Sequence, residues 1–155
     1  MKDIIIYVSK HHQNTKKVVD FLTEKFHIEA VNAENFSKDI SQYDNIIFMT
    51  GIYAFHLDES INKLIENLPL ENKRCFLIYT SAMDVDSFGK AFIKQIQKKN
   101  VSKCAFAHVP GFCTFGPFKL FKGVRKNHPD ANDLEKVADF YQEEIADEKS
   151  KDNRG

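Results

Sequence analysis

Residues 4–26 constrain the fold more strongly than any other part of the chain. They open with Ile-Ile-Ile-Tyr-Val at residues 4–8, a short apolar run rich in β-branched side chains, which is typical of a strand buried on both faces of a parallel sheet. From Val18 to Phe26, apolar residues recur at helical spacing. A polar turn joins the two segments. The sequence therefore predicts a strand, a turn and a helix that Asn14 or Thr15 caps.

The turn from Ser9 to Thr15 is suited to an anion. A helix start presents backbone N–H groups and about half a positive charge, which favours a phosphate. The side chains of Ser9, Asn14 and Thr15 add neutral donors. An ordinary capped turn between a strand and a helix has similar residues, so this segment alone leaves both interpretations open.

Strands and helices alternate along the rest of the chain. Further strands are expected at residues 27–33, 45–50, 74–79 and 104–109, and further helices at 36–43, 61–68, 88–96 and 130–145. This alternation predicts an open, five-stranded parallel sheet of the α/β class with helices on both faces. We expect one domain at residues 1–146 and a polar, frayed tail at 147–155.

Ligands of such sheets bind beyond the carboxyl ends of the strands, which selects residues 9–15, 50–55 and 80–85. The chain has no GxGxxG and no GK[ST], so dinucleotide and P-loop sites fit poorly. A response-regulator receiver needs acidic residues after the first strand and an Asp after the third. Here Ser9-Lys10 and Thr50 occupy those places.

Composition excludes several other classes. Lys plus Arg and Asp plus Glu number 22 each, so no overall charge attracts nucleic acid or an anionic membrane. The three cysteines (Cys75, Cys104 and Cys113) lack metal-ligand spacing, which favours reduced thiols and a cytoplasmic location. No apolar stretch approaches 18 residues, so no membrane span is expected. The sequence leaves the oligomeric state open.

Several motifs together resemble one family. Ser-Lys-His-His-Gln-Asn-Thr at residues 9–15 is similar to the flavodoxin phosphate loop, a hydroxyl residue and a short turn ending in Gly-Asn-Thr. The similarity continues at residues 50–53, 111–117 and 128–130. Over roughly residues 2–145 the chain resembles the flavodoxin-like family of single-domain FMN-binding flavoproteins. The resemblance implies a three-layer sandwich of strand order 2-1-3-4-5 and bound FMN.

The resemblance also implies a role for each loop. The phosphate would be held by Ser9, His11, His12, Asn14 and Thr15 and by the backbone of Lys10 and Gln13. The flavin ring would lie against Thr50, Gly51, Ile52 and Tyr53, with Tyr53 as its first flat wall and Phe55 as an alternative. The ring edge would be lined by Thr80, Ser81 and Ala82, and Phe115 and Gly116 would complete the site.

Gln13 departs from the family, which usually carries Gly at this position. If φ is positive there, a side chain costs about 1 kcal/mol, and FMN would bind less tightly.

Residues 110–129 have two interpretations. Phe112, Phe115, Phe118 and Phe121 recur every three residues, which favours a helical turn packed on the body. The alternative is a flap over the flavin, whose basic residues (Lys119, Lys122, Arg125 and Lys126) suit an acidic redox partner.

Two functional classes follow. The first is an FMN-dependent electron carrier or small oxidoreductase, acting on a redox partner protein or a quinone-like small molecule, with no side chain as essential acid, base or nucleophile. The second is a flavodoxin-like binding or regulatory module that has lost its flavin, for which Gln13 is the one supporting feature. Asp84 and Asp86 are expected in a solvated turn before Ser87, a candidate helix cap.

Overall fold

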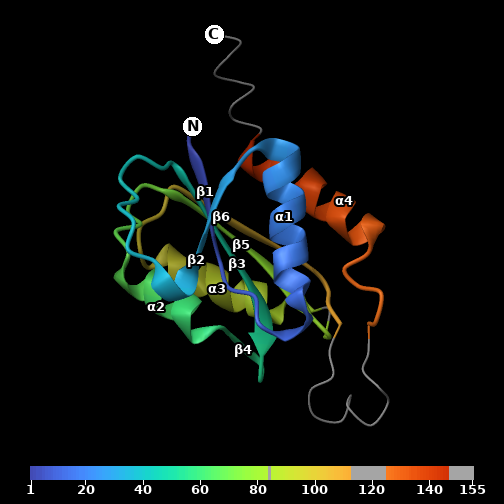
Figure 1. Ribbon diagram of the computed structural model, residues 1–155. Coiled ribbons are helices and arrows are strands. Elements are labelled where there is room, and N and C mark those ends of the chain that lie inside the picture. The colour runs from blue at the N-terminus through green and yellow to red at the C-terminus, as the bar shows by residue number, and fades with distance from the viewer. Residues whose placement is uncertain (84, 113–124, 147–155) are drawn as a thin grey trace.

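The chain is built around a parallel sheet, seen in a computed structural model that describes residues 1–83, 85–112 and 125–146 (Figure 1). Five parallel strands run in the order β2-β1-β3-β5-β6. Their bounds are β1 Asp3–Tyr7, β2 Glu29–Asn32, β3 Asn45–Tyr53, β5 Arg74–Ser81 and β6 Lys103–Pro110. This confirms the predicted α/β sandwich and the order 2-1-3-4-5, with β5 and β6 as the fourth and fifth parallel strands.

Helices cover both faces of the sheet (Figure 1). One face carries α1 (Asn14–Phe26) and α4 (Ala131–Phe140), which continues as the π-helical turn η4 (Tyr141–Ile145). The other face carries α2 (Glu59–Asn67) and α3 (Ser87–Gln97). Alternate strand residues enter the two cores: Ile4 and Ile6 face α2 and α3, whereas Ile5 faces α1 and α4. Burial on both faces explains why these strands are continuous apolar runs.

A short hairpin was not predicted. β3 reaches Tyr53 and turns into β4 (His56–Leu57), which pairs with it antiparallel, so residues 50–53 belong to the strand rather than to a loop after it. The two turn residues, Ala54 and Phe55, both have positive φ, at 48° and 67°. Hairpin turns of this kind normally carry Gly or Asn, and without them the sequence gives no turn signal.

The helix expected at residues 36–43 is wrong. The structure has only a 3-10 turn just before it, η2 (Ala33–Asn35), where the Asn32 side chain accepts a hydrogen bond from the Glu34 amide. Further on, Asp39 accepts from both the amide and the hydroxyl of Ser41. Such local side-chain bonds compete with helix formation and fix a turn instead.

The helix cap predicted at Ser87 is also wrong. Ser87 lies inside α3, and Asp86 precedes that helix without a side-chain capping bond. α4 begins where the last helix was expected to start, and Asp130 and Asp133 form a reciprocal capping box there.

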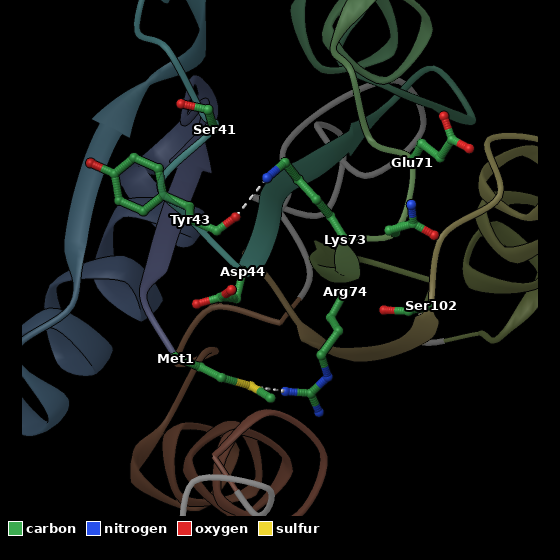
Figure 2. A pocket seen from close by; sticks show the side chains of 9 residues that line it. Met1, Ser41, Tyr43, Asp44, Glu71, Lys73, Arg74 and Ser102 are labelled. Carbon is green, nitrogen blue, oxygen red and sulfur yellow. Dashed lines mark hydrogen bonds between the residues drawn. The ribbon is translucent and has the colours of Figure 1, made fainter.

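The amino-terminal edge of the sheet, at the top of Figure 1, carries a polar pocket of about 340 Å³ (Figure 2). Buried Arg74 donates hydrogen bonds there to the Asn45 side chain and to the carbonyls of Glu144 and Ile145. Arg74 therefore ties the end of the C-terminal helix to the sheet. The pocket is lined by Met1, Ser41, Tyr43, Asp44, Glu71, Asn72, Lys73, Arg74 and Ser102.

Among the helices that the structure describes, none has the length and apolar character needed to cross a bilayer.

Candidate functional site

The structure brings the predicted loops together at the carboxyl edge of the sheet, the lower edge in Figure 1. The Thr15 and Thr80 hydroxyls are 3.2 Å apart, which joins the first loop to the end of β5. The Lys10 amide donates to the Tyr53 hydroxyl at 3.0 Å, which joins it to the end of β3. Residues that are far apart in the sequence therefore line one edge, as the sheet topology requires.

The first loop has the shape of an anion-binding turn. Residues His11–Gln13 form a 3-10 turn, η1, in which His12 and Gln13 have φ of 55° and 56°. Gln13 therefore has the positive φ for which relatives use Gly, and it immediately precedes α1. Successive residues of unusual handedness turn neighbouring backbone N–H groups toward a common point, which is how such loops hold anions.

The helix start is stabilised differently from the prediction. Neither Asn14 nor Thr15 caps α1, because both lie inside the helix. The Ser9 hydroxyl accepts a hydrogen bond from the Lys16 amide at 3.0 Å, and this contact satisfies one amide of the first helical turn. A hydroxyl that accepts in this way still has its own proton to donate.

The Lys10 side chain extends away from the loop toward α2. Its ammonium lies 2.8 Å from the Asp58 carboxylate and 3.4 Å from Glu34. The hydrogen bond to Asp58 raises the pKa of Lys10 above its ordinary value. Burial acts against ionisation of Asp58, yet its hydrogen bonds with Lys10 and Ser60 hold the pKa of this carboxyl below its ordinary value. The side chain of Lys10 therefore points away from the first loop, and Asp58 compensates its charge.

Sequence reasoning missed Asp58, although a signal was present. Asp58 caps α2 by accepting from the Ser60 amide at 2.9 Å, and Asp followed by Glu before an apolar stripe is an ordinary helix-start pattern. Its second role, as the anchor of Lys10, depends on a contact between distant segments.

The segment after Met49 presents one aromatic side chain to the first loop. Tyr53 is half buried, and a Cβ built on Gly51 would lie only 3.0 Å from its ring, so the hydroxyl end of the ring packs against the glycine. Thr50 is fully buried, and its hydroxyl donates to the Gly51 carbonyl at 2.8 Å. Ile52 packs against the core on the side of α2 and α3. Phe55, at the hairpin tip, is 68% exposed.

The loop after β5 is held by hydrogen bonds to its backbone. The Ser81 hydroxyl accepts from the Met83 amide at 3.2 Å, and the Ser81 carbonyl accepts from the Gly111 amide at 3.1 Å. Arg125 approaches the Ala82 carbonyl at 3.5 Å. The side chain of Met83 is 46% exposed beside these groups. This loop therefore offers a small polar edge flanked by an apolar side chain.

Gly111 and Phe112 lie against the first loop, although the sequence did not assign either residue to the site. The Asn14 side chain donates to the Phe112 carbonyl at 2.7 Å, and the Phe112 ring lies 4.2 Å from the His12 ring. A Cβ on Gly111 would lie 2.9 Å from the Asn14 amide nitrogen and 3.3 Å from Cβ of Thr80. The Gly in the Pro110-Gly111 pair was the available signal for this close approach.

Some predicted residues cannot be placed. Phe115 and Gly116 lie outside the described residues, as do Asp84 and Cys113, the other phenylalanines of the predicted stripe, and the side chain of His11.

Asp86 pairs with His108 at 2.6 Å, and this hydrogen bond lowers the pKa of the Asp86 carboxyl.

A group of possible metal ligands, His128, Asp130 and Asp133, has a structural explanation. The Asp133 carboxylate accepts from the Asp130 amide at 2.8 Å and contacts His128 Nδ1 at 2.5 Å. The bond with the Asp130 amide belongs to the capping box of α4, and His128 contacts the same carboxylate.

Comparison with known proteins agrees with this architecture. Residues 4–112 match the family described as Flavodoxin domain. An uncharacterized protein of Methanocaldococcus jannaschii is 34% identical over 146 residues, covering 90% of this chain and 95% of that protein. The flavodoxin of Streptococcus pneumonia TIGR4 superposes with a TM-score of 0.65 at 17% identity, covering 95% of this chain and 99% of that one.

A flavoprotein from Lactobacillus acidophilus NCFM, solved in complex with FMN, superposes with a TM-score of 0.54 at 16% identity. That match covers 68% of this chain and 92% of the flavoprotein. Since the family match spans most of the sheet and all three loops, the chain belongs to the flavodoxin domain family.

Proposed function

We propose that this protein binds FMN at the carboxyl edge of its sheet and acts as an electron carrier or a small FMN-dependent oxidoreductase. One observation carries the proposal: a loop rich in backbone donors, residues 9–15, is joined by side-chain contacts to the ends of β3, β5 and β6. Membership of the flavodoxin domain family and the FMN complex of the Lactobacillus flavoprotein support it.

The chemistry of the donors fits a phosphate. Hydroxyls and backbone amides at a helix start bind a phosphate without a cation when several donors converge on it. Ser9 and the amides of residues 10–15 are of this kind, and the Lys10 ammonium is paired with Asp58. We expect Asn14 and Thr15 to act mainly by fixing the loop, since they contact Phe112 and Thr80.

The apolar groups fit a flat ring. At Gly51 and Gly111 the missing side chain lets other residues approach the backbone: the Tyr53 ring lies against Gly51, and Asn14 and Thr80 lie against Gly111. Tyr53 supplies a flat face, Met83 an apolar side chain, and Thr80 to Ala82 a polar edge.

When bound, FMN supplies the transfer of electrons or hydride, and the protein supplies binding, orientation and electrostatics. The hydroxyls of these loops bond to backbone groups or to one another: Ser9 to Lys16, Thr50 to Gly51, Ser81 to Met83, and Thr15 to Thr80. We expect these hydroxyls to fix the shape of the loops rather than to act as nucleophiles. We propose that the oxidant or reductant is a redox protein or a quinone-like molecule in the cytoplasm.

A flavin-free module is the second candidate, and Gln13 favours it. Its φ of 56° imposes a strain that Gly avoids, about 1 kcal/mol, which works against a tight loop.

Spectroscopic titration separates the two candidates. The purified protein should bind added FMN and shift the flavin absorbance, lose its yellow colour with dithionite or NADPH, and regain it with quinones or oxygen. Failure to bind FMN in excess would contradict the proposal and leave the flavin-free module.

A further inference from the structure

The Tyr53 hydroxyl lies between the first loop and β3. The Lys10 amide donates to it at 3.0 Å, and a Cβ built on Gly51 would lie 3.0 Å from the same oxygen. Lys10 belongs to the anion-binding loop, and Gly51 belongs to β3. The phenol oxygen of Tyr53 therefore occupies the position in front of the Lys10 amide, where an oxygen of a ligand could also accept a hydrogen bond.

The two partners of this contact are held differently: the Tyr53 ring packs on a glycine, whereas Lys10 is anchored by an ion pair. The Tyr53 ring lies so close to Gly51 that an added Cβ would be 3.0 Å from both the ring and its oxygen. The Lys10 side chain is anchored to buried Asp58 at 2.8 Å. Because the ion pair with Asp58 restrains Lys10, we expect the hydrogen bond between the Lys10 amide and the Tyr53 hydroxyl to break by movement of Tyr53.

The backbone next to Tyr53 is strained. Ala54 and Phe55 follow it with φ of 48° and 67°, in a hairpin turn without Gly or Asn. Such strain costs energy and is characteristic of segments with a functional task. Phe55 makes little compensating contact, since its side chain is 68% exposed.

We propose that the Tyr53 hydroxyl competes with a phosphate oxygen of FMN for the Lys10 amide, so that Tyr53 must swing aside for the phosphate to bind. An N–H group makes one good hydrogen bond, and therefore the two oxygens are alternatives. This inference rests on the proposed FMN site and adds to it a residue that limits affinity and selects against weaker anions.

The test replaces Tyr53→Phe, which keeps the flat ring and removes the oxygen. We expect the Kd for FMN to fall about fivefold, since the phosphate no longer displaces a hydrogen bond. Riboflavin, which lacks the phosphate, should bind both proteins equally. The matched control is Tyr43→Phe, which removes a phenol oxygen at the opposite edge of the sheet, where it contacts Glu29, and should leave the Kd for FMN unchanged.

Hydrogen exchange tests the contact without a ligand. The Lys10 amide should exchange faster in Tyr53→Phe than in the unmodified protein, and equal rates would overturn the inference. Weaker or unchanged FMN binding by Tyr53→Phe, or an equal gain for riboflavin, would overturn it as well. If no variant binds FMN, the proposed function itself fails, which is a distinct result.

Discussion

The side-chain amide of Asn14 donates a 2.7 Å hydrogen bond to the backbone carbonyl of Phe112, 98 residues further along the chain. This contact fixes the loop after β1 to the end of β6, while the Phe112 amide donates to the carbonyl of His128 at 3.1 Å. Through Phe112, the loop at residues 9–15 is thus linked to the residues that precede α4.

Asn14→Ala removes this link, so we expect FMN to bind about tenfold more weakly, a loss of about 1.4 kcal/mol. The midpoint of thermal unfolding should change little. Isothermal titration against FMN measures the effect. Asn67→Ala is the control, because Asn67 makes a similar side-chain bond to the Lys63 carbonyl on exposed α2. An unchanged affinity of Asn14→Ala would mean that the loop does not contact the ligand.

Gly111→Ala places a methyl group 2.9 Å from the Asn14 amide nitrogen. We expect a loss of about 1–3 kcal/mol in the free energy of unfolding and, in addition, weaker FMN binding, because the loop must shift. Gly89→Ala separates the two effects: its methyl group would lie 2.0 Å from the Phe106 ring, within the packing of α3. This control should lose stability but keep its FMN affinity when folded. Equal affinity losses in both would show a general effect of destabilisation.

The Lys10–Asp58 pair should give a defined pH dependence of stability. The pKa of Asp58 is lowered, so its contribution is present above the ordinary value of 3.8 and is lost as the pH falls through the folded value. The pKa of Lys10 is raised, so its contribution is present below 10.5 and is lost as the pH rises through its folded value.

Asp58→Asn keeps a good helix cap and removes the charge. Since Lys10 is half exposed, solvent screening limits the expected loss to about 1 kcal/mol at pH 7. Denaturant unfolding at several pH values should show this difference disappearing in acid. A difference that persisted below pH about 2 would point to packing instead of charge.

Tyr141→Phe tests the opposite edge of the sheet. The Tyr141 hydroxyl donates to the buried Asp3 carboxylate at 2.5 Å, and burial together with this hydrogen bond raises the pKa of Tyr141. Removing a donor from a buried carboxylate should cost about 1.5–3 kcal/mol of unfolding free energy. Because the site lies at the other edge, the Kd for FMN of the folded variant should not change. Thermal unfolding and an FMN titration measure the two quantities.

The sequence predicted the sheet well because its strands are buried on both faces. Runs such as residues 4–8 and 75–79 are apolar throughout, and the helices between them have clear stripes. The strand order came from the family resemblance. The β3–β4 hairpin was not predicted because its turn residues, Ala54 and Phe55, adopt positive φ although neither is Gly or Asn. The expected helix at 36–43 failed because local bonds of Asp39 and Ser41 favour a turn.

The candidate site was predictable in its location but not in its contacts. Topology alone places residues 9–15, 50–53 and 80–82 at one edge. That Tyr53 bonds to Lys10, or that Asn14 turns to Phe112 rather than capping α1, depends on side-chain directions between distant segments. A one-dimensional pattern does not encode these directions.

The central claim is that FMN binds with its phosphate in the loop after β1. Two-dimensional NMR of the ¹⁵N-labelled protein during an FMN titration tests it most directly. The account predicts the largest shifts at the amides of residues 10–16, smaller ones at 51–53 and 80–82, and none around Arg74 at the opposite edge. Shifts centred on the pocket of Arg74, or no shifts with FMN in excess, would contradict it.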